Sequence, residues 1–186
     1  SGIYDALNIG IEQSSGEFIA ILNSDDFFGD DRVLSDIITV FERDQVDIVY
    51  SGITYVNPKY EIIGEWIPEE FSLGSFSDAW HPPHPGFFVR KTCYEKVGGF
   101  DLNFKGGADF ELMYRFMEIS KFKSALLSRS TVTMRNDGYS SLFKSRVQGL
   151  LDIRNTFYKH GNKTNLFVYF IKRYIKKLKR VLIQYF

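Results

Sequence analysis

The sequence predicts an α/β fold, in which helices pack against a sheet. Helical and strand-like patterns alternate along the chain, and the first two strand candidates, at 18–22 and 46–56, are rich in apolar residues with little polar alternation. The 186 residues suit one compact domain with an appendage, and 44% of them are hydrophobic. A core of ordinary size is therefore expected.

The first half of the chain is predicted to form two helices and three strands. The helices have apolar residues at helical spacing and are expected over 4–15 and 32–43. The strands are expected over 18–22, 46–56 and 61–67. We expect the first of them to be a central parallel strand, because no polar residue interrupts it. It ends abruptly in Asn23-Ser24-Asp25-Asp26.

The second half begins with an irregular, proline-marked segment over 68–85. Short strands are expected over 86–90, 124–127 and 131–135. Helices are expected over 91–97, 109–120, 141–159 and 166–186. We divide the chain into a domain over 1–140 and a C-terminal helical extension over 141–186.

Charge is distributed unevenly, although the net charge is zero. Residues 153–186 contain nine Lys or Arg and no acidic residue, whereas residues 1–152 hold 14 basic and 23 acidic side chains, a net charge of −9. The acidic body argues against nucleic-acid binding. The last helix has one apolar face among six basic residues, which favours contact with an anionic membrane surface. Its packing against the acidic body is the alternative.

Cysteine content and hydropathy exclude several classes of protein. Cys93 is the single cysteine, so neither a disulfide framework nor a thiolate zinc cluster is expected. No uncharged apolar run reaches the ~20 residues of a simple transmembrane helix. Aromatic residues make up 17% of the chain, which argues against disorder over most of its length.

Two acidic motifs are candidates for chemistry. Asp25 and Asp26 follow a buried strand, where a divalent cation would relieve their repulsion, but adjacent aspartates also occur in solvated turns. Asp109 follows Gly106-Gly107 at a helix start, where it is either an N-cap or a general base over a cleft. His84 lies in a rigid proline segment that could present it to a substrate.

Taken in order, these segments resemble family 2 glycosyltransferases of the GT-A fold. Gly2-Ile3-Tyr4-Asp5-Ala6-Leu7-Asn8-Ile9-Gly10-Ile11 is similar to the family's "G-I-Y-D-A-x-N-x-G-I" helix, and the strand ending at Asp26 to its metal motif. His84-Pro85-Gly86-Phe87-Phe88-Val89-Arg90 with Gly98-Gly99-Phe100-Asp101 resembles the acceptor-side block. Ala108-Asp109-Phe110-Glu111-Leu112 with Arg115 resembles the catalytic-base motif. The ordered set covers residues 2–141.

The resemblance implies a GT-A (Rossmann-like) mixed sheet and inverting transfer of a sugar from a nucleotide-sugar donor to an acceptor hydroxyl. The acceptor would be a glycan or a lipid-linked glycan of bacterial polysaccharide synthesis, and the cofactor Mn²⁺ or Mg²⁺. Together with the basic helix, this predicts a cytoplasmic protein held at the inner face of the cell membrane.

Roles follow for the matching positions. The metal would be held by Asp26 with Asp25, and Asp109 would be the general base. Donor or cofactor contacts would come from Asp5, Asn8 and Asp25. The acceptor would be bordered by Trp80, His84 and Glu111.

This sequence departs from the family pattern at three places. It starts at the helix after the family's first βαβ unit, which grips the nucleotide, so we expect residues 1–186 alone to bind donor weakly or not at all. Asn23 replaces the leading Asp of the metal motif, and Ala108 stands where many members carry an acid. The alternative is an incomplete or non-catalytic domain that only keeps the fold. A nucleotidyltransferase is disfavoured, because no glycine-rich basic loop lies near the start.

Overall fold

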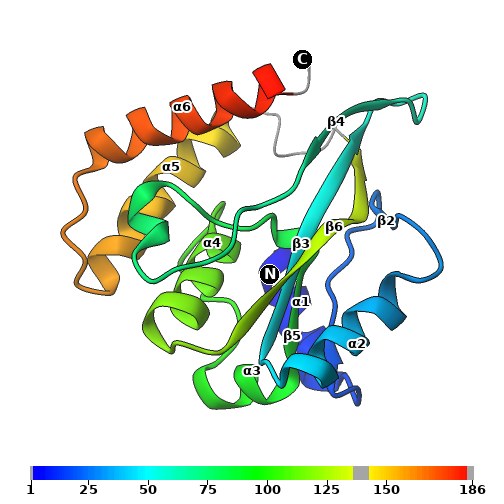
Figure 1. Cartoon of the computed structure of the whole chain (residues 1–186). Coiled ribbons are helices and arrows are strands. Elements are labelled where there is room, and N and C mark those ends of the chain that lie inside the picture. The colour runs from blue at the N-terminus through cyan, green and yellow to red at the C-terminus, as the bar shows by residue number, and fades with distance from the viewer. Residues whose placement is uncertain (1, 136–142, 184–186) are drawn as a thin grey trace.

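The chain folds into a mixed sheet between two layers of helices (Figure 1). This fold is seen in a computed structural model that describes residues 2–135 and 143–183, with the side chains of 143–147 and 179–183 left out. Helix α2, Val33–Asp44, covers one face of the sheet, and the other helices cover the opposite face. The α/β fold predicted from the sequence is confirmed.

Six described strands form the sheet. Five of them follow the order β1-β5-β3-β6-β2, and the sixth, β4, pairs with residues 53–56 of β3. Their bounds are β1 Phe18–Ile19, β2 Phe27–Phe28, β3 Ile48–Val56, β4 Ile62–Trp66, β5 Phe87–Arg90 and β6 Ser124–Arg135. Only β3 and β6 pair in parallel among the described strands, and every other pairing is antiparallel. The sheet is therefore mixed, as expected.

Two strand predictions need correction. The run at 18–22 is not a central parallel strand, because only Phe18–Ile19 is paired, and it pairs antiparallel with β5 at one end of the sheet. The two short strands expected at 124–127 and 131–135 are one strand, β6. Its register against β3 shifts around Gly52, so the residues between the two expected strands form a bulge within one continuous strand.

The helices largely follow the sequence pattern. They are α1 Ile3–Gln13, α2, α3 Lys91–Val97, α4 Ala108–Tyr114, α5 Phe143–Lys159 and α6 Leu166–Ile183. The helix expected over 109–120 is α-helical only to Tyr114 and continues as a π-helical turn over Arg115–Ile119. Turns of 3₁₀ helix at Ser75–Asp78 and His84–Gly86 interrupt the proline-marked segment.

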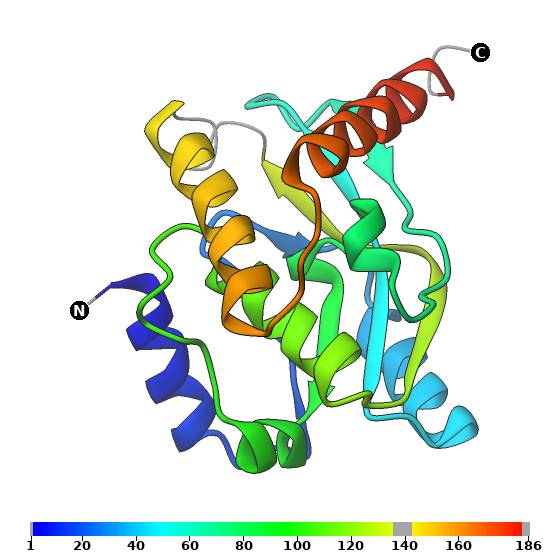
Figure 2. The same cartoon turned by 90° about the vertical axis from the view of Figure 1, so that its left-hand side faces the viewer.

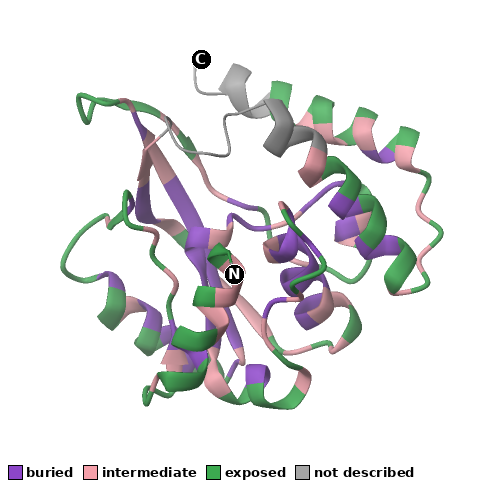
Figure 3. Cartoon of the chain, turned by 180° about the vertical axis from the view of Figure 1, so that it is seen from behind, coloured by how far each residue is buried: buried purple, intermediate pink, exposed green. Residues whose placement is uncertain are grey.

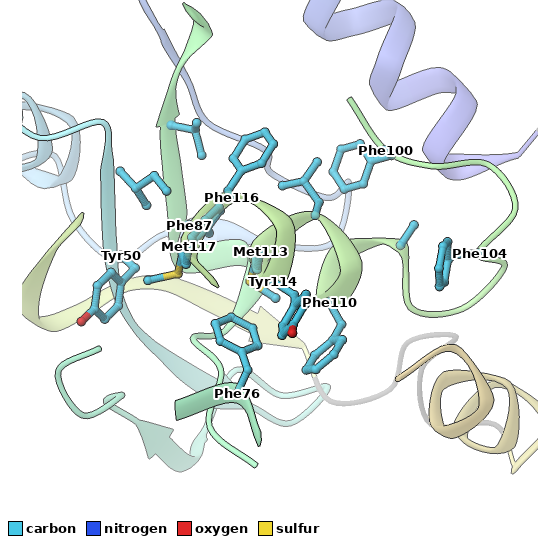
Figure 4. Packing of buried hydrophobic residues seen from close by; sticks show 14 of the residues in the cluster. Tyr50, Phe76, Phe87, Phe100, Phe104, Phe110, Met113, Tyr114, Phe116 and Met117 are labelled. Atoms are coloured by element: carbon cyan, nitrogen blue, oxygen red, sulfur yellow. The ribbon is translucent and has the colours of Figure 1, made fainter. Parts of the chain in front are cut away.

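Two hydrophobic cores lie on the two faces of the sheet. The smaller joins α2 to the sheet through side chains such as Phe41, Val49 and Ile53. The larger is an aromatic core around Phe76, Phe110 and other rings packed mostly edge to face (Figure 4). Strand β3 is buried along much of its length because it contributes to both cores (Figure 3).

The C-terminal helices share the larger core. Figure 2 shows α5 beside α4, and Ile153 and Phe157 of α5 are buried in that core together with Tyr169 of α6. On α6 the surface away from the body exposes Phe167, Ile171, Tyr174, Ile175 and Leu178. Within the part of the chain that the structure describes, no helix has both the length and the apolar character needed to cross a bilayer.

Candidate active site

A cleft of about 670 Å³ opens where α1, the segment after β1, the His84 turn and the start of α4 meet. Its walls are mainly apolar, with a few convergent polar groups, as in many ligand sites. The polar side chains that line it are Tyr4, Asn23, Ser24, Asp25, Asp26, His84, Lys105 and Asp109. The predicted metal ligands and the predicted base therefore lie in one cleft.

Asp26 is buried at the floor of this cleft, directly before β2. Its Oδ2 accepts a hydrogen bond of 2.8 Å from Asn23 Nδ2, whereas its buried Oδ1 has no hydrogen-bond partner within 3.5 Å, although the Arg135 backbone N–H is close enough to lower the pKa of the carboxyl. Burial raises the pKa of Asp26, the Asn23 hydrogen bond opposes this rise, and the neighbouring Asp25 adds to it. Such an orphaned carboxylate oxygen is costly unless a ligand satisfies it.

A divalent cation fits this donor set. Among the described residues no cluster of three His, Cys, Asp or Glu side chains could hold a metal by itself. Mg²⁺, however, is usually held by one or two carboxylates, with substrate phosphates and water completing its shell. Asp26 and the exposed Asp25 supply that number of carboxylates, and Asn23 fixes the orientation of Asp26.

Asp109 projects into the cleft from the first turn of α4. The helix begins after Gly107, and no side chain caps it, so Asp109 is not the N-cap. The preceding loop is fixed by Asp152 of α5, whose Oδ2 accepts a 2.8 Å hydrogen bond from the Gly106 N–H. The Asp109 side chain remains 28% exposed, so a substrate hydroxyl can reach it.

His84 connects the two acidic positions. Its Nδ1 lies 3.3 Å from Asp109 Oδ2, and its charge is close enough to Asp26 to lower the pKa of that carboxyl. On the other side, the Tyr4 hydroxyl donates to Asp109 Oδ1 over 3.4 Å. The sequence singled out His84 but not Tyr4, although Tyr4 lies inside the motif of α1.

Four predicted binding residues do not line the cleft: Asp5, Asn8, Trp80 and Glu111. Asn8 donates to the Phe100 carbonyl (2.9 Å) and accepts from the Phe100 N–H (2.7 Å), so both ends of its amide are used in packing α1 on that loop. Trp80 is buried among aromatic rings, and its Nε1 donates to the Glu69 carbonyl. Asp5 lies on α1 outside the cleft wall.

Glu111, predicted to border the acceptor, is instead fully buried behind the cleft. Its carboxylate accepts hydrogen bonds from Arg115 Nε (3.1 Å), Lys159 Nζ (2.7 Å) and His160 Nε2 (2.9 Å). Burial alone would raise the pKa of Glu111, but these bonds outweigh it and hold the pKa below its usual range. This placement makes Glu111 a structural link between α4 and α5.

We expect Glu111→Gln to lower the free energy of unfolding by about 1.5–3 kcal/mol, because it weakens the hydrogen bonds that Arg115 and Lys159 donate to a buried charge. Exposed Glu12→Gln should change it by less than about 0.5 kcal/mol. Because the pKa is lowered in the fold, the stabilisation is present at neutral pH and is lost as the pH falls through that pKa. Urea unfolding at pH 7 and pH 4 measures both effects, and equal losses in the two variants would contradict the link.

Lys105 is a further cleft residue that the sequence did not single out. It is exposed at the rim, directly before Gly106-Gly107. In the sequence, its position beside a glycine pair could have pointed to it, but many surface lysines have such a position.

The chain is similar to known proteins in both sequence and fold. The model of the family described as "Glycosyl transferase family 2" matches residues 1–96. An uncharacterised glycosyltransferase of Mycobacterium tuberculosis is 32% identical over 117 residues, covering 61% of this chain and 44% of the relative. One of Rickettsia typhi is 25% identical over 141 residues, covering 70% and 44%. The chain thus spans less than half the length of these relatives.

Solved structures show the same fold. The S. aureus TarS 1-349 structure in complex with UDP-GlcNAc has a TM-score of 0.60 and 16% identity, covering 84% of this chain and 46% of that one. The complex of TarS 1-349 with UDP has a TM-score of 0.56 and 14% identity, covering 84% and 45%. Identity this low indicates a shared fold.

Proposed function

Because this chain belongs to glycosyl transferase family 2, we propose that it transfers a sugar from a nucleotide-sugar donor to an acceptor hydroxyl with inversion at the sugar carbon. The observation that carries the proposal is that Asp26 and Asp109 line one cleft, with His84 beside both. The complexes of TarS with UDP and UDP-GlcNAc support a nucleotide-sugar as the donor. The acceptor proposed is a glycan or lipid-linked glycan.

The geometry suggests one displacement step. Asp109 accepts the proton of the acceptor hydroxyl, whose oxygen bonds to the anomeric carbon from the face opposite the leaving group. The bond from that carbon to the nucleoside diphosphate breaks, and the diphosphate leaves with the electron pair. The apolar walls of the cleft, which include Leu7 and Met113, limit competing attack by water.

Asp26 and Asp25 are proposed to hold Mg²⁺ or Mn²⁺ at the diphosphate end of the cleft. When bound, the cation would offset the negative charge that develops on the leaving group. Support comes from the partnerless, buried Oδ1 of Asp26 and from the exposed Asp25 beside it.

Donor screening tests the proposal. The intact protein that contains this chain is incubated with a panel of nucleotide-sugars, an acceptor extract and Mn²⁺ or Mg²⁺, and nucleotide release is measured. We expect release with one donor class that depends on the acceptor extract. The absence of release with every donor, alongside an intact fold, would favour the non-catalytic alternative.

The exposed apolar stripe of α6 supports a second part of the proposal, contact with an anionic membrane. Phe167, Ile171, Tyr174, Ile175 and Leu178 recur at helical spacing on its outer surface. Some of the flanking charge is used internally: Lys172 pairs with Asp78 (2.6 Å) and Lys176 approaches Glu69 (3.8 Å). The stripe therefore has to supply much of the binding energy, and the remaining cations the preference for anionic lipid.

We expect the Ile171→Ser, Ile175→Ser double variant to lose sedimentation with phosphatidylserine vesicles. Leu34→Ser with Ile38→Ser on α2 is a matched control, because these two residues are 49% and 41% exposed and the α6 pair 45% and 46%. The control should still sediment, and added salt should weaken binding of the unmodified protein. Equal sedimentation of both double variants would show that the α6 stripe is not the contact.

A further inference from the structure

Two side chains from different elements converge on the carboxylate of Asp109. The Tyr4 hydroxyl, from the first turn of α1, donates to Oδ1 over 3.4 Å. His84 Nδ1, from the turn before β5, lies 3.3 Å from Oδ2. Oδ1 of the carboxylate thus has one hydrogen-bond donor, Oδ2 lies within ion-pair distance of an imidazole nitrogen, and each oxygen keeps a lone pair for a ligand.

Tyr4 is itself held firmly. Its ring stacks on Phe100, with ring centroids 5.3 Å apart and an interplanar angle of 27°. Both backbone polar groups of Phe100 are bound by Asn8 on the next turn of the same helix. Burial, and secondly the charge of Asp109, raise the pKa of Tyr4, so its hydroxyl keeps the proton that it donates.

His84 is equally restrained. Pro83 and Pro85 flank it, and the 3₁₀ turn at His84–Gly86 ends in the buried strand β5. An unprotonated Nδ1 at 3.3 Å would repel the carboxylate, so the proposed contact requires the hydrogen to be on Nδ1. The ring then has Nε2 on the side away from Asp109.

We propose that Tyr4 and His84 are positioning residues that together fix the rotation of the Asp109 carboxylate and so aim one lone pair at the acceptor hydroxyl. This inference rests on the proposed role of Asp109 as the base. An unrestrained carboxylate would sample many rotations, because its terminal torsion is broad. Two donors from separate elements select one rotation, and a misaligned base loses rate steeply. Contacts of this length in a ligand-free cleft are expected to shorten when substrate binds.

A double-mutant cycle tests the role of Tyr4. We expect Tyr4→Phe to lower kcat roughly 10-fold, the effect of losing one hydrogen bond to a charged group, while the KM for the donor stays unchanged. In an Asp109→Asn background the same change should cost nothing further, because no base remains to be aimed.

Tyr114→Phe is the matched control for that cycle. Tyr114 is buried on the same helix as Asp109, and its hydroxyl also has one side-chain partner, Asn162, but it does not line the cleft. Tyr114→Phe should lower the free energy of unfolding by a comparable amount and leave kcat unchanged. Additive losses for Tyr4→Phe and Asp109→Asn would overturn the positioning role and leave the proposed function standing.

His84 is tested by rescue. His84→Asn keeps an N–H donor near the position of Nδ1, whereas His84→Ala removes it. We expect kcat to fall roughly 10-fold or more in His84→Ala and to recover substantially in His84→Asn. Equal losses in both variants would show that the ring acts in another way.

A measurement independent of turnover separates this inference from the proposed function. In protein labelled with ¹³Cζ-tyrosine, the Tyr4 signal is assigned by its loss in Tyr4→Phe. Asp109→Asn should shift that signal and leave the Tyr114 signal in place. If the Tyr4 signal does not move, the Tyr4–Asp109 contact is overturned, whether or not the protein shows turnover. If the signal shifts but no turnover is found with any donor, only the proposed function is overturned.

Discussion

Replacing Asp109 by Asn is expected to lower kcat by a factor on the order of 10²–10⁴, the usual contribution of a general base. The amide has the shape of the carboxylate but cannot accept the proton of the acceptor hydroxyl. The donor KM should change little, because Asp109, which contacts His84 and Tyr4, is proposed to act on the acceptor hydroxyl rather than on the donor diphosphate. Steady-state kinetics of nucleotide release in the intact protein measure both constants.

The structure makes this test cleaner than the sequence suggested. The sequence left open that Asp109 was an N-cap, in which case the Asn variant would still cap the helix and keep its activity. In the fold, α4 begins after Gly107 without a side-chain cap, and Asp109 lies within the first turn. Loss of its charge there removes only about 0.3–1 kcal/mol of interaction with the helix dipole.

Asp36→Asn is the matched control. Asp36 is also the acidic residue in the first turn of a helix, α2, on the opposite face of the sheet. It pairs with Arg129 at the surface, so its loss should have a small effect on stability and none on kcat. Normal turnover in Asp109→Asn would remove the base from the proposed mechanism, and equal losses in both variants would point to a general effect on the fold.

Local sequence patterns predicted where the helices and most strands lie, but not which strands pair with one another. Helical spacing placed α1, α2 and α6 within a few residues, because burial of one face is encoded in consecutive turns. The position of β1 could not be predicted in this way, since its partner β5 lies some 70 residues further along the chain. An apolar run indicates a buried strand but contains nothing about which strand lies beside it or in which direction.

In the candidate site, too, local motifs were informative only where a residue's place does not depend on distant partners. Asp25, Asp26, His84 and Asp109 lie in the cleft as the motifs predicted. Glu111 does not, because its partners Lys159 and His160 lie at the end of α5 and in the turn after it, nearly 50 residues away in the sequence. Only the folded chain shows that these side chains hydrogen-bond to its carboxylate.

Asn8 and Trp80 lie outside the cleft for a related reason. A polar or amphipathic side chain within a motif suggests a ligand contact, yet the same groups serve to join backbone segments. Asn8 binds Phe100, and Trp80 binds the Glu69 carbonyl from within the aromatic core. In each case the partner is a backbone group, which has no signal in the sequence.

Asp26 differs from the other acidic residues in the cleft in how its ionisation affects the stability of the fold. It is buried, one of its oxygens has no hydrogen-bond partner, and its pKa is raised first by burial and then by Asp25, against the lowering effect of Asn23. A carboxyl whose pKa is raised by folding stabilises the fold at low pH. That contribution is lost as the pH rises through the folded pKa. At neutral pH the charge of Asp26 therefore costs stability in the absence of a cation.

Asp26→Asn should consequently separate stability from function. Without metal, the variant should unfold at the same temperature as the unmodified protein or a higher one, because Asn carries no charge and can still accept the Asn23 hydrogen bond. Added Mn²⁺ should raise the unfolding temperature of the unmodified protein by binding only its folded form, and should leave that of the variant unchanged. Turnover should fall by a factor on the order of 10² or more, since charge on the leaving diphosphate is no longer offset.

Asp31→Asn is the control for this experiment, because Asp31 is an exposed acid only five residues further along the chain. It should keep both turnover and the Mn²⁺-dependent rise in unfolding temperature. Full turnover of the unmodified protein in excess chelator would refute metal dependence. A clear drop in the unfolding temperature of metal-free Asp26→Asn would instead show that the buried carboxylate is stabilised within the fold, so that its partnerless oxygen would no longer argue for a cation.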